Sequence, residues 1–203
     1  MWGVAMLGLC VVLSAGWVYP ATAEEMRAEP DKSAENRQAK VETLVSEGRK
    51  AFESKEFERA IDSLSDALKL DSESQEALYW RAKSLSRVQR EKDALVDYFR
   101  LLYLNPKDWR AQNNVGFIYA KLGKFDQALP YFQKAFEING DPQMLLNAAF
   151  AAYRSHNIQL GLRLCRQVAE MDKDGKYGAD AEALMQKILA AQRKRNEPPP
   201  QAK

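Results

Sequence analysis

The chain has 203 residues, of which 46% are hydrophobic and 29% are charged. This composition is typical of a folded domain and excludes a mainly disordered chain or a mainly membrane-embedded one. Lys and Arg number 30 against 28 Asp and Glu, so the net charge of +2 gives no indication of a nucleic acid partner.

Residues 1–23 carry no charged side chain. An apolar run over residues 2–19 is followed by Pro20 and by the small residues Ala21-Thr22-Ala23. This pattern is typical of a secretory signal peptide, so we expect cleavage before Glu24 and a periplasmic or secreted protein. No Lys or Arg precedes the apolar run, and about 18 apolar residues can span a bilayer. The alternative is an uncleaved membrane anchor at residues 2–19, which would limit membrane contact to residues 1–23.

Residues 24–40 precede the first periodic pattern, and we expect them to form a lead-in or linker, flexible from Glu24 to about Lys32. The chain has two cysteines, Cys10 and Cys165. Cleavage before Glu24 would leave Cys165 as the single thiol, which cannot form an internal disulfide.

A constant spacing runs through the middle of the chain. Gly48, Ala82 and Gly116 are equally spaced, at a period of about 34 residues that lies in the range typical of stacked structural repeats. The same interval separates three further sets of residues: Ala60, Ala94 and Ala128; Leu64, Tyr98 and Phe132; Ala67, Leu101 and Ala135.

A weaker fourth copy follows after the register slips by one position. Ala149, Gly161 and Cys165 follow Gly116, Ala128 and Phe132 at an interval one position shorter than the period. The period therefore predicts four units, at residues 41–74, 75–108, 109–141 and 142–175.

Each unit reads as two amphipathic helices joined by a tight turn. In the third unit we expect a helix from Trp109 to Leu122 that ends at Gly123-Lys124. A second helix is expected to begin near Asp126 as its N-cap and to continue to Ile138. Pro130 would then lie at the edge of the first turn, where a missing N–H does least harm. The run Asn139-Gly140-Asp141-Pro142 is expected to end the unit.

Gly116 lies inside a predicted helix, where glycine costs about 1 kcal/mol relative to alanine. Small residues at 48, 82, 116 and 149 each precede a small residue by the same interval, at 60, 94, 128 and 161. We expect these positions to be contact points between antiparallel helices. Gly116 would then allow a neighbouring helix to approach closely.

These units resemble the tetratricopeptide repeat, a family of helix-turn-helix repeats of about 34 residues. The resemblance rests on Val115-Gly116-x-x-Tyr119, Ala128-x-x-x-Phe132 and Ala135, with Pro106 closing the second unit. Gln112 stands where the family often has tryptophan, and Glu91 replaces the usual aromatic residue of the turn. The resemblance covers about Val41 to Gly175. It implies an all-α fold, an α-solenoid of about four helix-turn-helix repeats.

The end of a stacked repeat array needs a cap with a polar outer side. Residues 177–195 carry an apolar stripe at helical spacing and are expected to form a C-terminal capping helix. The Pro-rich tail, residues 196–203, is expected to be disordered. The stripe consists of Ala181, Leu184, Met185, Ile188 and Leu189.

Residues suited to catalysis or metal binding are few. The one histidine, His156, lies in a predicted turn, and we expect it to be solvent exposed. Cys165 occupies the periodic position of Phe132, which favours a buried thiol over a nucleophile. Residues 170–182 offer acidic side chains around a glycine, but the final glutamate falls one position late for an EF-hand loop. We therefore predict an inter-helix linker there, and no catalytic residue, metal or cofactor.

The resemblance implies a partner-binding groove lined by the first helix of each repeat. Amides in such a groove bind a peptide backbone, cations bind carboxylates, and aromatic rings supply contact area. Val45 and Trp80 stand at two positions of the family's carboxylate clamp, so we expect that clamp to be absent. The predicted groove residues are Arg49, Phe52, Tyr79, Lys83, Arg87, Arg110, Asn113, Asn114, Phe117, Lys121, Asn147, Phe150 and Arg154.

Two functions follow as hypotheses. The first is a non-catalytic scaffold, adaptor or assembly factor that holds a segment of a protein or peptide partner in the groove, outside the cytoplasm. The second is a structural subunit of an envelope complex or homo-oligomer, which would use the convex face and the capping helix.

Overall fold

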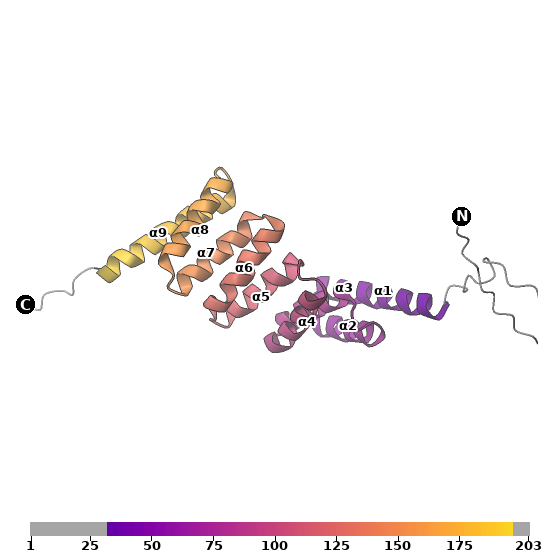
Figure 1. The fold of residues 1–203 in the computed structure, drawn as a ribbon. Coiled ribbons are helices and arrows are strands. Elements are labelled where there is room, and N and C mark those ends of the chain that lie inside the picture. Colours follow the sequence, from indigo (N-terminus) through magenta and orange to yellow (C-terminus); the bar gives the residue numbers. More distant parts are fainter. Residues whose placement is uncertain (1–31, 197–203) are drawn as a thin grey trace, which may run out of the picture. The chain divides into compact units, whose positions relative to one another are not determined.

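The computed structural model describes residues 32–196. Every regular element in this range is an α-helix, as the sequence predicts (Figure 1). The predicted signal peptide and residues 197–203 of the predicted tail lie outside the described residues. In chain order the helices are α1 (Lys32–Glu53), α2 (Phe57–Leu70), α3 (Gln75–Arg87), α4 (Glu91–Leu104), α5 (Trp109–Lys121), α6 (Phe125–Asn139), α7 (Pro142–Arg154), α8 (Ile158–Met171) and α9 (Lys176–Asn196).

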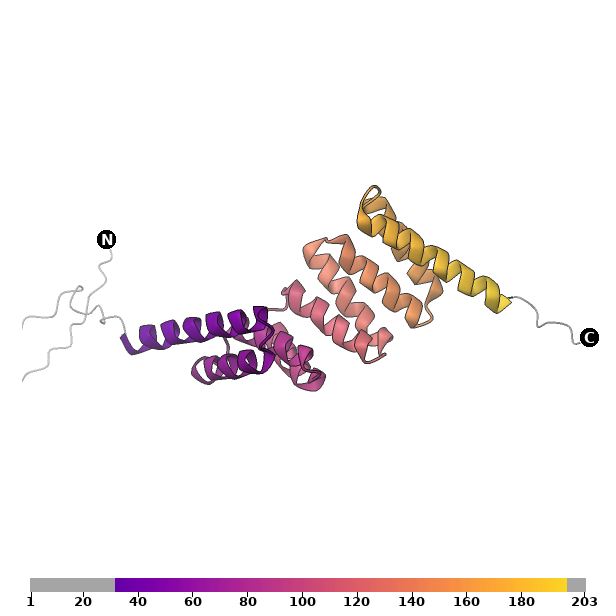
Figure 2. The ribbon, with the colours of Figure 1, turned by 180° about the vertical axis from the view of Figure 1, so that it is seen from behind.

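The helices follow the predicted repeats in pairs. We call α1, α3, α5 and α7 the A helices and α2, α4, α6 and α8 the B helices. From α2 to α9 each helix packs against the next one in the chain. Helices α5, α6 and α7 lie side by side both in Figure 1 and from behind in Figure 2. Helix α9 packs on α8 and α7, the place expected for the capping helix.

Helix α1 begins earlier than the first predicted repeat. It starts at Lys32, so residues 32–40 are helical and continuous with the first repeat, where the sequence predicts a lead-in or linker. The physical reason is the composition of this stretch, which consists mostly of Ala, Glu, Arg, Gln and Lys and contains neither glycine nor proline. Side chains 33–40 are exposed, so helix propensity rather than burial accounts for this extension.

The third repeat corrects two local predictions. Helix α6 begins at Phe125 with Lys124 as its N-cap, so Asp126 lies in the first turn and is not the capping residue. Pro130 lies inside α6 instead of at the edge of its first turn. It is exposed, and it leaves the carbonyl of Asp126 without its usual intrahelical N–H partner. The end of the repeat is as predicted, because Gly140 adopts φ 72° and Asp141 caps α7 by accepting from the N–H of Gln143 at 2.9 Å.

The turn between the A and B helices has the same backbone conformation in all four repeats. Lys55, Gln89, Gly123 and His156 occupy equivalent positions and have φ values of 64°, 63°, 75° and 64°. In each turn the following N–H donates to the carbonyl five positions earlier, as in a Schellman motif; these bonds measure 2.8 to 2.9 Å. This hydrogen bond holds three non-glycine residues in the left-handed region, where glycine is favoured.

Gly116 packs directly against a buried ring. A Cβ atom at Gly116 would lie 2.7 Å from a ring carbon of Phe132, and Phe132 is 2% exposed. Likewise, a Cβ atom at Gly48 would lie 2.5 Å from Leu64 Cγ. The close approach expected at Gly116 is therefore present, although the atoms nearest to it belong to the bulky Phe132 and not to Ala128.

One buried charged pair links three helices of the first two repeats. Arg81 on α3 donates through Nε and Nη2 to both carboxylate oxygens of Asp97 on α4, at 2.8 and 2.7 Å. Arg81 also donates to the Ser65 hydroxyl at 3.2 Å. This bidentate pair links α2, α3 and α4, and the Asp97 side chain is only 4% exposed.

The linker before α9 is built around Asp172. Its carboxylate accepts from the N–H groups of Tyr177 and Gly178 at 2.7 and 3.2 Å. A Cβ atom at Gly178 would lie 2.1 Å from the backbone carbonyl oxygen of Asp172, so this position requires glycine. The carboxylate thus accepts two backbone hydrogen bonds at the N-terminus of α9.

None of the helices between residues 32 and 196 is both long and apolar enough to cross a membrane.

Candidate functional site

Aromatic rings and cations gather where the A helices of the first two repeats meet. We call Phe52, Tyr79, Trp80, Lys83 and Arg87 the aromatic–basic cluster. The ring centroids of Phe52 and Trp80 lie 5.4 Å apart. Lys83 Nζ lies 4.6 Å from the Trp80 ring centroid and 4.8 Å from that of Phe52. These distances are within the range of cation–π attraction.

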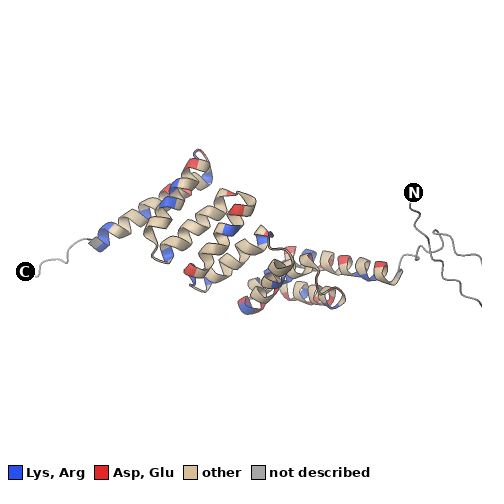
Figure 3. Cartoon of the chain, in the orientation of Figure 1, with Lys and Arg blue, Asp and Glu red and all other residues tan. Residues whose placement is uncertain are grey.

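Three other cations among the predicted groove residues have acidic partners. Arg49 pairs with Glu53 at 3.0 Å. Arg110 on α5 pairs with Asp108 at 2.9 Å and with Glu76 on α3 at 3.2 Å. Lys121 forms a short ion pair with Glu91, which lowers the pKa of that glutamate. Figure 3 shows the resulting mixture of acidic and basic residues along the described helices.

Lys83 and Arg87 differ from these cations. Neither makes an ion pair with any residue in the described part of the chain. Burial lowers the pKa of Lys83, and the nearby positive charges of Arg87 and Arg110 lower it further, while Glu53 raises it. The cluster therefore has two cations for which the described residues supply no carboxylate.

Two predicted groove residues are less accessible than the sequence analysis expects. Tyr79 is 8% exposed and lies beneath Arg110, whose guanidinium is 4.4 Å from the ring centroid. Burial raises its pKa, and a hydrogen bond with Asn114 partly offsets that effect. Asn113 is half-buried, and its Oδ1 is enclosed without a partner among the described residues. Tyr79 is thus part of the core that supports the surface, because Arg110 covers it from the following repeat.

The later A helices are less charged at the equivalent position. Phe117 and Phe150 stand where the first two repeats have Arg49 and Lys83, and they are 45% and 37% exposed. Phe150 packs edge-on against Phe125 at 6.1 Å, and Arg154 lies 4.3 Å over the Phe125 ring. Asn114 and Asn147 recur nearby on α5 and α7, half-buried.

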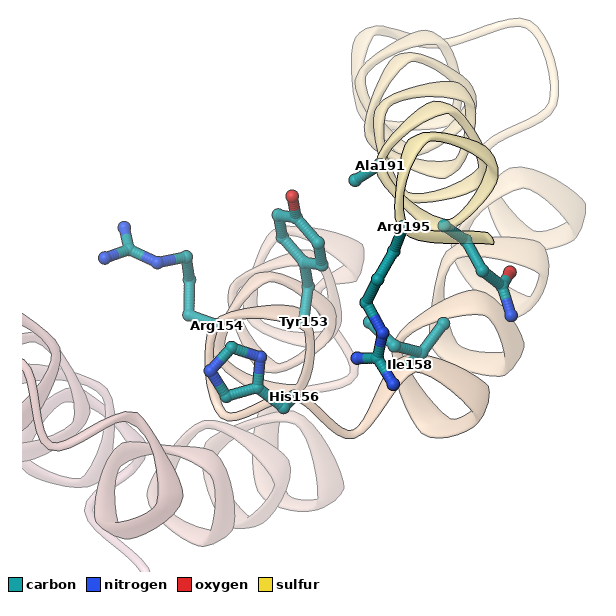
Figure 4. A pocket seen from close by; sticks show the side chains of 7 residues that line it. Tyr153, Arg154, His156, Ile158, Ala191 and Arg195 are labelled. Carbon is teal, nitrogen blue, oxygen red and sulfur yellow. The ribbon is translucent and has the colours of Figure 1, made fainter. Parts of the chain in front are cut away.

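A cavity of about 320 Å³ lies between α7 and α9 (Figure 4). His156 is exposed in the turn, as predicted, and Arg195 reaches the cavity from the last turn of α9. In Figure 4 the side chain of Arg154 points away from Arg195. The lining residues are Tyr153, Arg154, His156, Ile158, Ala191, Gln192 and Arg195, a set without a carboxylate or a thiol.

The side chains that could support catalysis or metal binding are dispersed. No three His, Cys, Asp or Glu residues converge as metal ligands within residues 32–196. Cys165 is buried, as expected, and burial raises its pKa to about 11. A thiol in that state is a poor nucleophile.

The sequence analysis missed Trp80 as a member of the surface. It treated Trp80 only as a departure from the family's clamp, yet the ring contacts Phe52, Tyr79 and the two cations Lys83 and Arg49. The period alone could have predicted Trp80 as a groove residue, because it precedes the predicted groove residue Asn114 by one full repeat.

Comparison with known proteins agrees with the helical repeat fold described above. The tetratricopeptide repeat family model matches residues 109–142, which span α5 and α6. Over 166 residues the chain is 30% identical to small glutamine-rich tetratricopeptide repeat-containing protein 2 of Saccharomyces cerevisiae, covering 76% of this chain and 46% of the yeast protein. The chain spans less than half the length of the curated relatives it matches.

Two solved structures show the same fold. YrrB, described as a TPR protein with an unusual peptide-binding site, matches with a TM-score of 0.68 at 22% identity, covering 81% of this chain and 84% of YrrB. The MamA protein matches with a TM-score of 0.64 at 22% identity, covering 70% of this chain and 76% of MamA.

Helix pairs that recur with a constant period, each packed on the next from α2 to α9, define a helical repeat protein. The chain has the fold of a tetratricopeptide repeat protein, and the family model matches its third repeat. Proteins of this family are generally non-catalytic and bind other proteins.

Proposed function

We propose that the protein holds an extended segment of a partner protein against its A helices. The observation that carries this proposal is the recurrence of exposed aromatic side chains and half-buried amides at equivalent positions. Phe117 and Phe150 are 45% and 37% exposed, and each follows an asparagine by three positions, Asn114 and Asn147. Rings supply rigid contact area, and amides can donate to and accept from a peptide backbone.

The likeness to YrrB supports this proposal, since that protein is described as having a peptide-binding site. We further propose that binding takes place outside the cytoplasm, because residues 1–23 have the pattern of an export signal. The intact mass of the native protein tests this location, and retention of residues 1–23 would contradict cleavage.

Photo-cross-linking tests the surface directly. We expect p-benzoylphenylalanine in place of Phe117 to give an adduct with a different protein in the cells that make this chain. The ring is 45% exposed on an A helix, so the substitution changes its contacts little. Met171, 46% exposed at the end of the B helix α8, is the matched control position. Adducts with a different protein from position 171 but none from position 117 would contradict the proposal.

One observation favours self-association as a second candidate function. Val96, Phe99 and Tyr103 form an apolar stripe along α4 and are 66%, 40% and 86% exposed. An exposed stripe of large apolar side chains is typical of an interaction surface. A second copy of the chain could cover it by packing α4 against α4.

Sedimentation velocity at micromolar concentration tests the second candidate. We expect a discrete oligomer that the double substitution Val96→Glu/Tyr103→Glu converts to monomer, because four carboxylates in an α4–α4 contact would repel each other. Gln127→Glu/Gln159→Glu introduces the same charge on exposed positions of α6 and α8 and should leave the oligomer intact. A monomeric wild-type protein would contradict self-association.

A further inference from the structure

We propose that the bound segment carries an acidic side chain against Lys83 and Arg87 and, about three residues away, an apolar side chain against Phe117. This inference rests on the proposed function and adds the chemistry of the partner. It also gives the spacing of the two side chains, because the two subsites lie on successive A helices.

The charges around the aromatic–basic cluster support an acidic side chain in the bound segment. Glu53 is paired with Arg49, and Glu76 is paired with Arg110. Lys83 and Arg87 remain without an ion pair to the described residues. Because both Glu76 and Asp108 pair with Arg110, the net excess around the cluster is one positive charge, which suits one carboxylate. The acids nearby would repel a polyanion such as a nucleic acid backbone.

The environment of Lys83 would strengthen its attraction for a carboxylate. Its Nζ lies 4.6 and 4.8 Å from the ring centroids of Trp80 and Phe52, which exclude water from one side. Arg87 follows one helical turn later, with its guanidinium 6.0 Å from the same Phe52 ring. The two cations thus share one ring. A carboxylate placed between them would make charge-assisted hydrogen bonds in a partly desolvated site.

The apolar side chain of the bound segment is inferred from the repeat register. Phe117 occupies on α5 the position that Lys83 occupies on α3, one repeat earlier. Its ring packs edge-on against Phe132 at 5.2 Å and remains 45% exposed, so it is held in place and accessible. Packed helices lie about 10 Å apart, and an extended chain advances about 3.3 Å per residue. A segment that crosses from α3 to α5 therefore needs about three residues.

Selection from a library of random dodecapeptides displayed on phage tests both halves. On the wild-type chain we expect Asp or Glu to be enriched about three positions from Leu, Ile, Phe or Met. On Lys83→Gln/Arg87→Gln the acidic preference should disappear and the apolar one remain. On Phe117→Ser the apolar preference should disappear and the acidic preference should remain. Arg163→Gln/Arg166→Gln removes two exposed cations from α8 and should leave both preferences unchanged.

A selected peptide then measures the effect in solution by fluorescence anisotropy. Changing its acidic residue to the amide should raise Kd at least about tenfold on the wild-type chain and less than about twofold on Lys83→Gln/Arg87→Gln. Equal affinity of acid and amide peptides for the wild-type chain would overturn the inference while leaving the proposed function intact. Failure to enrich any peptide, together with absent cross-links from position 117, would contradict both.

Discussion

Replacing Arg81 by methionine should lower the free energy of unfolding by about 3 kcal/mol, measured by urea denaturation followed by circular dichroism. Arg81 makes two hydrogen bonds of 2.7 and 2.8 Å to Asp97. Its removal leaves a carboxylate that is 4% exposed without its cationic partner. A buried charge without a partner is strongly destabilising, and methionine keeps most of the apolar packing of the arginine stem.

The opposite substitution provides the control. Asp97→Asn leaves Arg81 without its carboxylate, but the Arg81 side chain is 25% exposed and water can solvate it. We expect a smaller loss of about 1.5 kcal/mol. The double substitution Arg81→Met/Asp97→Leu should cost less than the two single changes combined. A loss below about 0.5 kcal/mol for Arg81→Met would show that the pair does not stabilise the fold.

Gly116→Val should also lower the free energy of unfolding by about 3 kcal/mol. The first added carbon alone would lie 2.7, 2.8 and 3.0 Å from three ring atoms of Phe132. The ring is 2% exposed and is surrounded by packed side chains, so it cannot move aside freely. Valine adds two further carbons and gains little helix propensity. Thermal and urea unfolding measure the loss.

The second repeat offers a matched comparison, since Ala82 occupies the position of Gly116 there. Ala82→Gly should destabilise by about 1 kcal/mol, because no clash is relieved and helix propensity is lost. Phe132→Leu should recover part of the stability lost in Gly116→Val by removing ring atoms. Stabilisation by Gly116→Ala of about 1 kcal/mol, as in an unpacked helix, would contradict the tight contact.

The period predicts the fold because it depends on the packing of whole helix pairs. The interval from Gly48 to Gly116 places a small residue against a large one in the first and third units, Leu64 and Phe132, and so indicates which helices pair. Individual turn residues could not be predicted in this way. Gln89 and His156 adopt positive φ although their residue types do not favour it, because the helices on both sides and the Schellman hydrogen bond require it. Asp126 is a residue type that often caps helices, but α6 begins one residue earlier, at Phe125.

The candidate site was only partly predictable for a related reason. Residue types and helical spacing indicate which side chains share a face, and they predict Phe52, Lys83 and Arg87 together. They do not show that Arg110 crosses from the third repeat to Glu76 and covers Tyr79. Such contacts join residues about one repeat apart and depend on the side-chain rotamers of neighbouring helices. The ion pairs that leave Lys83 and Arg87 unmatched therefore appear only in the structure.

The packing of each helix on its sequence neighbours also bears on how the chain folds. Its long-range contacts bridge roughly one repeat, so contact order is low and each step closes only a short loop. Folding can nucleate in any repeat and propagate to both sides, without one obligatory nucleus. Side chains 33–40 at the start of α1 are exposed, so fraying and hydrogen exchange should begin there.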